Sequence, residues 1–390
     1  MCVAALEEIK LKNTKVKVIN FINGMEQGGA QQILINALRY FKCNQHIDFS
    51  LYVLDENKGS KYDKIIEREQ LKVTYVGNMS SKINIWGIRR LLMSYQICSA
   101  IDKIIQKEKP DIVHIHISKL LAHAASQIKK HKEVMFFDTL HSDPSRYQGY
   151  DLTLLKKCFN KYGVIPVCVT DYQVKRAKNH YTLQDVELVR NSIEIAILKN
   201  KEVSKTEARE KLGFPKNVYI VGAVGRLNAI KRYDFLMETF ALLKKQKNEA
   251  MLIFAGTGPE QQNLVNLAKE YGISDSVVFL GMIENMAEVY CSIDVLAVTS
   301  VSESCSLVAL EAQVFERKCV ISNGVPDSVI VSDNVIRMPE SATNEQWKEA
   351  LLGNWDCSPK GQLSLEDYDI DTTQKHLEEL YIKYATIKKS

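Results

Sequence analysis

Residues 293–316 have the sequence IDVLAVTSVSESCSLVALEAQVFE, in which an apolar run is followed by a polar turn and then by a second segment rich in apolar residues. The first run predicts a short buried strand, and the segment from about Ser306 onward predicts a helix. A buried strand that leads through a turn into a helix is the repeating unit of α/β domains with parallel sheets. This stretch therefore predicts the α/β class.

The same alternation of short apolar runs and longer amphipathic stretches occupies most of the chain. Helices are expected between the strands, for example over residues 29–42 and 84–107. Near residues 191–205 the chain becomes polar and the alternation then starts again, which indicates a boundary between two domains. The expected strands span residues 16–22, 48–54, 72–76, 111–116, 133–139, 164–169, 218–224, 250–255, 276–280, 293–298 and 318–322.

The length of 390 residues exceeds what one hydrophobic core usually supports, which is roughly 250–300 residues. We therefore predict two tandem, doubly wound, Rossmann-like α/β domains over residues 1–195 and 196–372, followed by a closing amphipathic helix over 373–390. Open parallel sheets bind ligands at the carboxyl ends of their strands, so we expect the ligands in a central cleft that both domains face.

The composition excludes several classes of protein. Apolar residues make up 46% and charged residues 25%, a globular balance that argues against a disordered or fibrous chain. No apolar run reaches the roughly 18–20 residues of a membrane span, and the starting sequence MCVAALEEIKLKNTK does not match a signal peptide. The nine cysteines are scattered without a C-x-x-C motif, which argues against a disulfide framework or a zinc knuckle. We expect a cytoplasmic protein.

The charge is distributed unevenly along the chain. Residues 1–195 hold 29 Lys and Arg against 20 Asp and Glu, whereas the remainder carries a net charge of −5. A basic first half indicates an anionic partner, and because no nucleic-acid motif accompanies it, we expect an anionic membrane rather than nucleic acid. Residues 82–107 place Trp86 and Tyr95 beside Arg89 and Arg90, which suits a helix lying at a membrane surface. The alternative is a helix packed on the core with one solvated side.

Two glutamates flank the helix start that the opening stretch predicts. The exposed amides of a helix N-terminus form an anion site, here expected at Ser304, Cys305, Ser306 and Leu307. A carboxylate beside bound phosphate is unfavourable, so Glu303 and Glu311 are better suited to accept hydrogen bonds from neutral sugar or ribose hydroxyls. The alternative is a solvated pair of glutamates at a helix start.

This segment resembles the Glu-x7-Glu signature of the retaining glycosyltransferases of family 4, which have the GT-B fold. Further motifs match that family in the same order, over about residues 16–330. The segment EAQVFERKCVISNGVP (311–326) is similar to the capsule and exopolysaccharide branch of the family. These motifs are NGMEQGGAQQILINAL (23–38), PDIVHIH (110–116), TLHS (139–142), GRL (225–227) with Lys231, FAGTGPEQQNL (254–264), VVFLGMI (277–283) and EAQVFERKCVISNGVP (311–326).

The resemblance implies a role for residues of both halves. Arg226 and Lys231 correspond to the family's cationic clamp on the diphosphate of the donor, where fixed positive charge stabilises the departing group. Arg226 directly follows the strand expected over residues 218–224, and Lys231 is expected to begin the next helix. His141 corresponds to a histidine beside the donor sugar and its phosphate. Gly28 and Gly29 correspond to the diglycine loop, in which backbone amides approach a phosphate.

The remaining donor-binding residues follow from the same resemblance. Gly256 and Gly258 belong to the loop that matches the family's G-x-G-P motif, and Met282 follows the strand expected near the base of the nucleotide. The sequence departs from the family at Thr299, where proline is usual, and in the turn after Glu303, where a glycine is usual.

Two patterns that could indicate a metal are better explained otherwise. His114 and His116 alternate along one strand and share a face, but no further ligand is spaced to complete a site. The acidic run Asp367, Asp369 and Asp371 lies beyond both expected sheets, where a solvated loop is the simpler explanation. We therefore expect no metal or other cofactor.

The resemblance implies a retaining transfer of a sugar from a UDP- or GDP-linked donor to a glycan or lipid-linked acceptor in surface polysaccharide synthesis. It implies front-face substitution, in which the donor phosphate accepts the acceptor's proton. Two alternatives remain open on the same fold. One is a sugar-nucleotide epimerase, and the other is a non-catalytic subunit that binds a nucleotide sugar.

Overall fold

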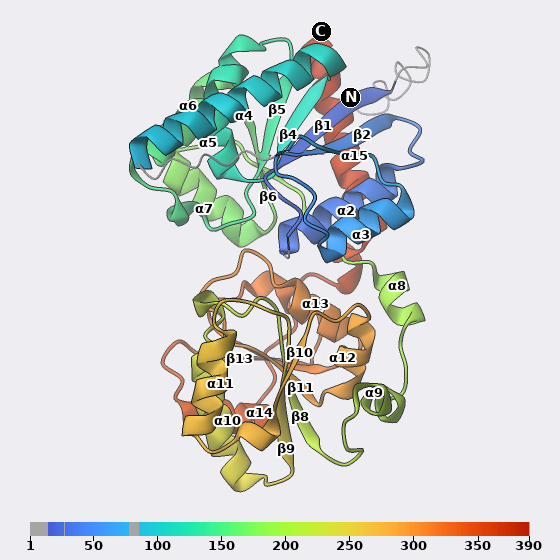
Figure 1. Ribbon diagram of the computed structural model, residues 1–390, viewed down its shortest axis with the longest axis vertical. Coiled ribbons are helices and arrows are strands. Elements are labelled where there is room, and N and C mark those ends of the chain that lie inside the picture. The colour runs from blue at the N-terminus through green and yellow to red at the C-terminus, as the bar shows by residue number, and fades with distance from the viewer. Residues whose placement is uncertain (1–14, 27, 78–85, 390) are drawn as a thin grey trace. The chain divides into compact units, whose positions relative to one another are not determined.

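The computed structural model describes residues 15–26, 28–77 and 86–389, without the side chains of residues 86–90 and 389 (Figure 1). The chain forms two compact units. The first comprises Met1–Ser192 together with Ile370–Ser390, and the second comprises Ile193–Asp369. The C-terminal helix α15 (Ile370–Lys389) thus belongs to the first unit, where it packs on a helix and two strands that come much earlier in the chain.

The first unit is built on a seven-stranded sheet in the order β3-β2-β1-β4-β5-β6-β7, and every recorded pairing is parallel. Strand β1 lies between β2 and β4, so the direction of winding reverses between β1 and β4, where doubly wound sheets bind their ligands. The strands are β1 (Val16–Ile22), β2 (Ile47–Val53), β3 (Val73–Tyr75), β4 (Ile112–Ile115), β5 (Met135–Thr139), β6 (Ile165–Cys168) and β7 (Glu187–Leu188).

Helices cover both faces of this sheet, and each face has its own hydrophobic core (Figure 1). One core lies under α2, α3 and α15, and the other lies under α4, α5, α6 and α7. Side chains buried on both faces explain why the strands are nearly continuous apolar runs. The helices before α15 are α2 (Gly29–Phe41), α3 (Lys61–Glu69), α4 (Trp86–Glu108), α5 (Ser118–Lys130), α6 (Gly149–Tyr162) and α7 (Asp171–Tyr181).

The second unit repeats the arrangement with a six-stranded parallel sheet in the order β10-β9-β8-β11-β12-β13. Its winding reverses between β8 and β11. The strands are β8 (Tyr219–Val224), β9 (Ala250–Ala255), β10 (Val277–Gly281), β11 (Val295–Val298), β12 (Lys318–Ile321) and β13 (Val335–Arg337). The helices are α8 (Ile195–Asn200), α9 (Lys205–Leu212), α10 (Tyr233–Gln246), α11 (Gln261–Glu270), α12 (Met286–Ser292), α13 (Leu307–Val314) and α14 (Asn344–Leu352).

The entry and exit of the second unit lie side by side. Ile193 and Asp369 form an isolated parallel bridge, and the amide of Ile193 donates to the carbonyl of Tyr368 at 2.8 Å. Within the first unit, the side chain of Gln374 lies 3.3 Å from the Ser192 hydroxyl. The chain therefore leaves the first unit and returns to it at neighbouring residues.

The fold prediction is confirmed, since each half is a doubly wound parallel α/β unit. Every expected strand is present with ends that differ by two residues or fewer, whereas the short strands β7 and β13 were missed. The domain boundaries were expected after residues 195 and 372, and in the structure they fall after residues 192 and 369. Among the helices that the structure describes, none combines the length and hydropathy needed to cross a membrane.

Candidate functional site

Three loops meet at the carboxyl end of the second sheet, and two glycines let them cross closely. The amide of Leu227 donates to Thr257 O at 3.0 Å, and that of Gly256 donates to Gly281 O at 2.7 Å. A Cβ on Gly256, whose φ is +140°, would lie 2.0 Å from Gly225 O, and one on Gly258 would lie 2.2 Å from Leu227 O. Both positions therefore require glycine because the backbones of the loops pack directly on each other. The contact of these glycines with a nucleotide-sugar donor stays a prediction.

The ammonium of Lys231 and the carboxylate of Glu303 form an ion pair at the same end of the sheet. Lys231 Nζ lies 2.5 Å from Glu303 Oε1, and the Ser300 hydroxyl donates to the same oxygen at 2.7 Å. Both side chains are mostly buried, with 17% and 15% exposed, so the pair is shielded from solvent more than a surface pair would be. The structure thus joins two residues that the sequence analysis had assigned separate roles.

The backbone around Lys231 differs from the expected helix start. Lys231 ends a 3-10 turn (Ala229–Lys231), and α10 begins only at Tyr233, because Arg232 adopts a left-handed conformation with φ of +50°. The Thr299 hydroxyl donates to Lys231 O at 2.6 Å, and the amide of Val301 donates to Ile230 O at 2.8 Å. The expectation that Lys231 opens the helix is therefore wrong. The turn after β11 instead holds the Lys231 loop directly.

Glu311 lies on α13 and is held by a tyrosine that the sequence analysis did not single out. The hydroxyl of Tyr290, on α12, donates to Glu311 Oε2 at 2.6 Å. Tyr290 is fully buried and stacks on Phe315 with ring centroids 5.7 Å apart. Burial, followed by the nearby Glu311 carboxylate, raises the pKa of Tyr290 well above 10, so its hydroxyl stays protonated and keeps donating.

The start of α13 agrees only in part with the expected anion site. Ser306 is the N-cap and Leu307 the first helical residue, whereas Ser304 and Cys305 lie in the turn before them, so those two do not belong to the helix N-terminus. Ser306 is 2% exposed, and its buried hydroxyl does not cap the helix and has no hydrogen-bond partner within the described part of the chain. A buried hydroxyl beside uncapped amides can donate to a bound anion.

Two further predicted residues lie exposed at the same end of the sheet. Arg226 directly follows Gly225 after β8, and no ion pair of Arg226 is found among the residues that the structure describes. Met282 follows β10 and has 43% of its surface exposed. Both side chains are available to a ligand.

In the first unit, three histidines gather where the winding of the sheet reverses. His116 follows β4 and His141 lies two residues beyond β5, with His116 Nδ1 at 3.3 Å from His141 Nε2. The rings of His114 and His116 stack with centroids 4.2 Å apart, as expected for side chains on one face. His114 Nδ1 lies 2.6 Å from the Tyr381 hydroxyl, and its Nε2 lies 2.7 Å from the Thr139 hydroxyl.

Burial keeps these rings neutral. Desolvation lowers the pKa of His114 to about 3 and that of His141 to about 4, and it holds the pKa of His116 well below 6.5. The nearby His141 adds to the effect on His114, and both neighbours add to that on His116. At neutral pH the cluster therefore carries no positive charge.

Gly28 and Gly29 lie at the start of α2 in the same unit. Gly28 is the N-cap in an extended conformation with φ of 175°, and the first turn of α2 contains no acidic residue. A Cβ on Gly28 would lie 2.4 Å from Gln31 Oε1, so the flexible Gln31 side chain would have to move. The helix start is compatible with an anion, and its role stays a prediction.

Comparison with known proteins identifies the family of the chain. A model described as "Glycosyl transferases group 1" matches residues 204–351, and one described as "Glycosyltransferase Family 4" matches residues 28–196. Together they span most of both units. This chain is a family 4-type glycosyltransferase.

Its curated relatives are distant. N-acetyl-alpha-D-glucosaminyl L-malate synthase of Bacillus anthracis is 25% identical over 248 residues, which cover 60% of this chain and 62% of the relative. EpsF of Bacillus subtilis (strain 168) is 21% identical over 346 residues, which cover 87% of this chain and 88% of EpsF. The match thus spans less than two thirds of the first relative.

Solved structures show the same fold over nearly the whole length. Anabaena HepE, in complex with UDP and glucose, superposes with a TM-score of 0.71 at 15% identity and covers 96% of this chain and 97% of HepE. Sucrose-phosphate synthase from Thermosynechococcus elongatus gives a TM-score of 0.73 at 15% identity and covers 95% of this chain and 99% of that enzyme. At this identity the likeness establishes the GT-B fold.

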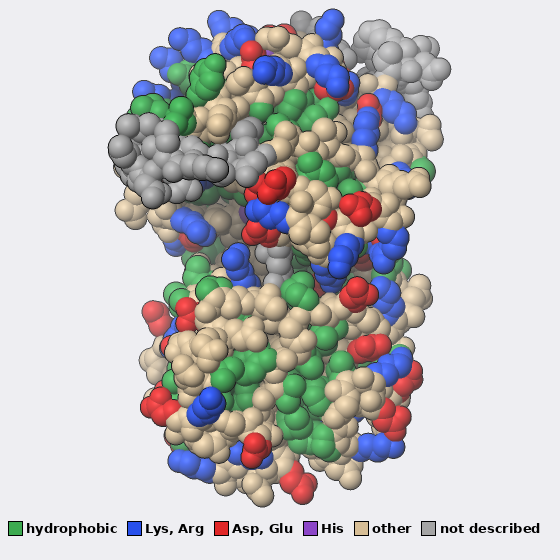
Figure 2. Space-filling model, viewed as in Figure 1, with side chains coloured by type: hydrophobic (Ala, Val, Ile, Leu, Met, Phe, Trp, Pro, Cys, Tyr) green, Lys and Arg blue, Asp and Glu red, His purple; other side chains and the backbone are tan. Residues whose placement is uncertain are grey.

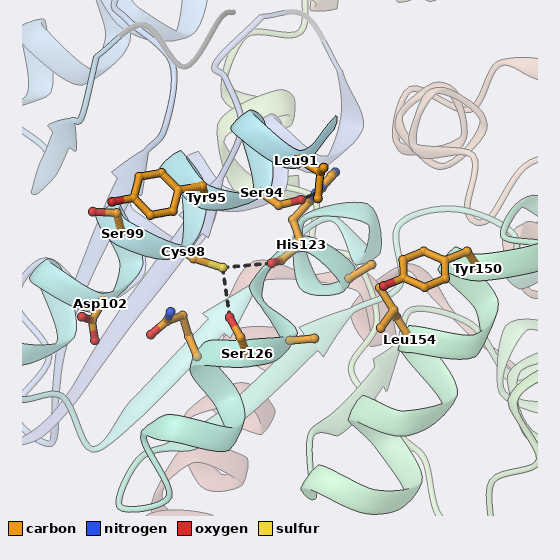
Figure 3. Close-up of a pocket in the computed structure, with 13 residues that line it drawn as sticks. Leu91, Ser94, Tyr95, Cys98, Ser99, Asp102, His123, Ser126, Tyr150 and Leu154 are labelled. Carbon is orange, nitrogen blue, oxygen red and sulfur yellow. Dashed lines mark hydrogen bonds between the residues drawn. The ribbon is translucent and has the colours of Figure 1, made fainter. Parts of the chain in front are cut away.

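The glycosyltransferase also has a large pocket on the helices of its first unit. Its volume is about 920 Å3, and α4, α5 and α6 line it (Figure 3). Leu91 and Tyr95 on α4 and Tyr150 on α6 are 72%, 73% and 66% exposed. Cys98 contacts His123 O at 3.1 Å and the Ser126 hydroxyl at 3.2 Å across its floor. Residues 82–85 and the side chains of Trp86, Arg89 and Arg90 lie outside the described residues.

The acidic run near the C-terminus has a structural role in the glycosyltransferase. The carboxylate of Asp367 accepts from the Ser364 amide at 2.8 Å in a capping box at a 3-10 turn (Leu365–Tyr368). Within the described ranges, no three histidine, cysteine or acidic side chains gather in an arrangement that could hold a metal.

Proposed function

We propose that this glycosyltransferase moves a sugar, with retention of configuration, from a UDP- or GDP-linked donor to a glycan or lipid-linked acceptor in surface polysaccharide synthesis. The observation that carries the proposal is the Lys231–Glu303 pair beside the start of α13, at the reversal point of the second sheet. A cation, uncapped amides and a carboxylate lie together there, and these groups suit a diphosphate and the hydroxyls of a sugar. The binding of UDP and UDP-glucose by HepE supports the donor class.

The geometry favours a front-face reaction over a covalent intermediate. A double displacement needs a carboxylate that is free to attack the anomeric carbon. Glu303 is neutralised by Lys231, and Glu311 is bound by Tyr290. In the front-face route the bond from the anomeric carbon to the diphosphate oxygen breaks, the acceptor oxygen bonds to the same face, and its proton passes to the departing phosphate. Lys231 and Arg226 stabilise the charge that develops there.

A donor-turnover assay tests the proposal. UDP- and GDP-sugars are first screened by thermal shift, because a ligand that binds the folded state raises its stability. The stabilising donor is then incubated with and without candidate acceptors. Transfer that needs an acceptor supports the proposal. Interconversion of the sugar without acceptor would identify an epimerase, and binding without any turnover would identify a non-catalytic subunit.

We expect catalysis to be independent of divalent metal. The developing charge on the diphosphate can be stabilised by a bound cation or by fixed protein charges, and Arg226, Lys231 and the start of α13 supply the second route. Transfer rates measured in excess EDTA should stay close to those in magnesium. Loss of transfer in EDTA with recovery on adding manganese or magnesium would contradict this prediction, and nucleotide binding measured in parallel would show whether the metal acts on the donor.

We propose that the first unit contacts an anionic membrane through α4, at the inner face of the cell membrane. Leu91 and Tyr95 present exposed apolar surface on this helix, and the first half of the chain is basic. Lys and Arg side chains are spread over the visible face of the first unit rather than gathered in one patch (Figure 2). The attraction is therefore diffuse, and the exposed apolar side chains supply the local contact.

Flotation with vesicles that contain phosphatidylglycerol tests this contact. The protein should float at low salt and be released as salt screens the surface charge. Changing Leu91 and Tyr95 together to serine should abolish flotation, whereas Tyr271→Ser, at an exposed tyrosine of the second unit, should not. No flotation at low salt, or equal flotation of both variants, would contradict the proposal.

A further inference from the structure

The turn that carries Glu303 is held by the loop between β12 and the next 3-10 turn, which we call the Gly324 loop (residues 322–326). The amide of Glu303 donates to Gly324 O at 2.9 Å. A Cβ on Gly324 would lie 2.2 Å from Val301 O and 2.5 Å from Ser300 O. The two backbones are thus in direct contact, and glycine is required there. The position of Glu303 therefore depends on the position of this loop.

The Gly324 loop also reaches the carboxylate of Glu303. The Ser322 hydroxyl donates to Ser300 O, and the Ser300 hydroxyl donates to Glu303 Oε1 at 2.7 Å. The same carboxylate oxygen pairs with Lys231 Nζ at 2.5 Å. A displaced loop would therefore move both the backbone of Glu303 and the hydroxyl that orients its side chain.

Arg337, the last residue of β13, holds the carbonyl groups of the two residues that flank Gly324. Its Nη1 donates to Asn323 O and Asn323 Oδ1, both at 3.4 Å, and its Nη2 donates to Val325 O. The donors of a guanidinium form a rigid planar fork, so one side chain sets the spacing of both carbonyls. The carbonyl between them, that of Gly324, accepts from the Glu303 amide. Arg337 therefore holds the loop on both sides of the residue that Glu303 contacts.

The contacts of the Arg337 guanidinium outside this loop are unfavourable or weak. The side chain is 20% exposed, and its buried Nε has no hydrogen-bond partner among the residues that the structure describes. A buried N–H without an acceptor costs free energy. The ion pair with Asp327, at 2.8 Å, offsets little of this cost, because the Asp327 side chain is 86% exposed. The guanidinium is therefore kept in place mainly by its bonds to the Gly324 loop.

We propose that Arg337 is a positioning residue for Glu303, which holds the Gly324 loop so that the Glu303 carboxylate stays where it meets the transferred sugar. This inference rests on the proposed function, in which Glu303 contacts that sugar. Every contact from Arg337 to Glu303 lies within the second unit. A shift of about 1 Å in a reacting group can lower a rate by up to ~10²-fold, so a residue that touches no ligand can still control the chemical step.

Hydrogen exchange at the Glu303 amide, followed by NMR, tests this hold without any substrate. Arg337→Met keeps an unbranched apolar side chain of similar length and removes every donor. The Glu303 amide should then exchange about tenfold faster or more, because its acceptor is no longer fixed. The Leu264 amide on α11, which donates to Glu260 O at 3.0 Å, is the control and should not change. Unchanged exchange at Glu303 in the folded variant would overturn the proposal.

Transfer kinetics with the stabilising donor separate positioning from stability. We expect kcat of Arg337→Met to fall about 10–100-fold, with little change in Tm or in affinity for the nucleoside diphosphate. Arg337→Lys keeps a cation that can reach one carbonyl at a time and should recover part of the rate. Asp327→Asn removes only the exposed ion pair and should transfer at the unaltered rate.

Each remaining outcome has one meaning. A folded Arg337→Met that transfers normally, or one that loses nucleoside diphosphate binding as severely as transfer, would contradict the positioning role. If Arg337→Met does not fold, Arg337→Lys provides the same two measurements, with smaller changes expected. If the unaltered enzyme transfers no sugar, the proposed function fails, and exchange at the Glu303 amide still decides whether Arg337 holds the turn.

Discussion

Replacing Lys231 by alanine should lower the rate of sugar transfer by about 10²–10³, the usual effect of removing one preorganised group that stabilises developing charge. Two effects combine. The departing diphosphate loses a stabilising cation. The Glu303 side chain, which is 15% exposed, loses its ion pair, and its Oε1 then accepts only from the Ser300 hydroxyl. An unpaired carboxylate repels a diphosphate, so affinity for the nucleoside diphosphate should fall as well. Steady-state kinetics and calorimetric titration measure the two effects.

A surface ion pair provides the matched control. Lys211 lies 2.9 Å from Glu207 on α9, with 45% and 50% of these side chains exposed. Lys211→Ala removes an equal charge from the same unit and should leave transfer unchanged. Arg226→Ala, at an exposed cation, should also lower transfer by about 10²–10³ but leave Glu303 paired. A Lys231→Ala enzyme that transfers at the rate of Lys211→Ala would remove Lys231 from the reaction.

Replacing Glu303 by alanine should abolish transfer while the nucleoside diphosphate still binds. Glu303 is expected to contact the transferred sugar, so the chemical step depends on it. Its removal also frees the Lys231 ammonium from its ion pair, and that cation then meets the diphosphate without competition. Lys231→Ala should thus lower the affinity for the nucleoside diphosphate, whereas Glu303→Ala should raise it. Nucleoside diphosphate binding that falls as severely as transfer would contradict this role.

Glu311→Ala is the comparison within the same segment. Glu311 is expected to accept from the ribose hydroxyls, so its loss should weaken donor and nucleoside diphosphate alike by roughly 1.5–3 kcal/mol, the scale of a charged hydrogen bond. Tyr290→Phe removes only the hydroxyl that holds Glu311 and should have a smaller effect in the same direction. Unchanged affinity in a folded Glu311→Ala variant would exclude Glu311 from the site.

The sequence predicted the elements well and their side-chain partners poorly, for a physical reason. Apolar runs buried on both faces are visible in the sequence, and the strands that were missed, β7 and β13, contain only two or three residues at sheet edges. Lys231 and Glu303 are 72 positions apart, and Tyr290 and Glu311 are 21 apart on different helices. Their pairing depends on how the loops close, which no local pattern records.

The histidines show the same limit more sharply. The spacing of His114 and His116 predicts a shared face, which the stacked rings confirm. The hydrogen-bond partner of His116 Nε2 is the side-chain oxygen of Asn20, which lies on β1, 96 positions earlier in the chain. The amide nitrogen of Asn20 donates to Ser50 O. Similarly, no sequence pattern indicates the left-handed conformation of Arg232, because arginine seldom adopts it. Lys231 was therefore predicted to begin the helix, whereas it ends the 3-10 turn before α10.

The second unit is a continuous insertion in the chain of the first, because the chain returns to the first unit beside the point where it left. Two breaks, at residues 192/193 and 369/370, would release it as one segment whose ends are held together by the bond from Ile193 to Tyr368. Ends that lie close together are what domain insertion tolerates. Recombination between related genes can therefore replace this unit whole, without redesigning the sheet that receives it, and hybrid enzymes can be built at the same two junctions.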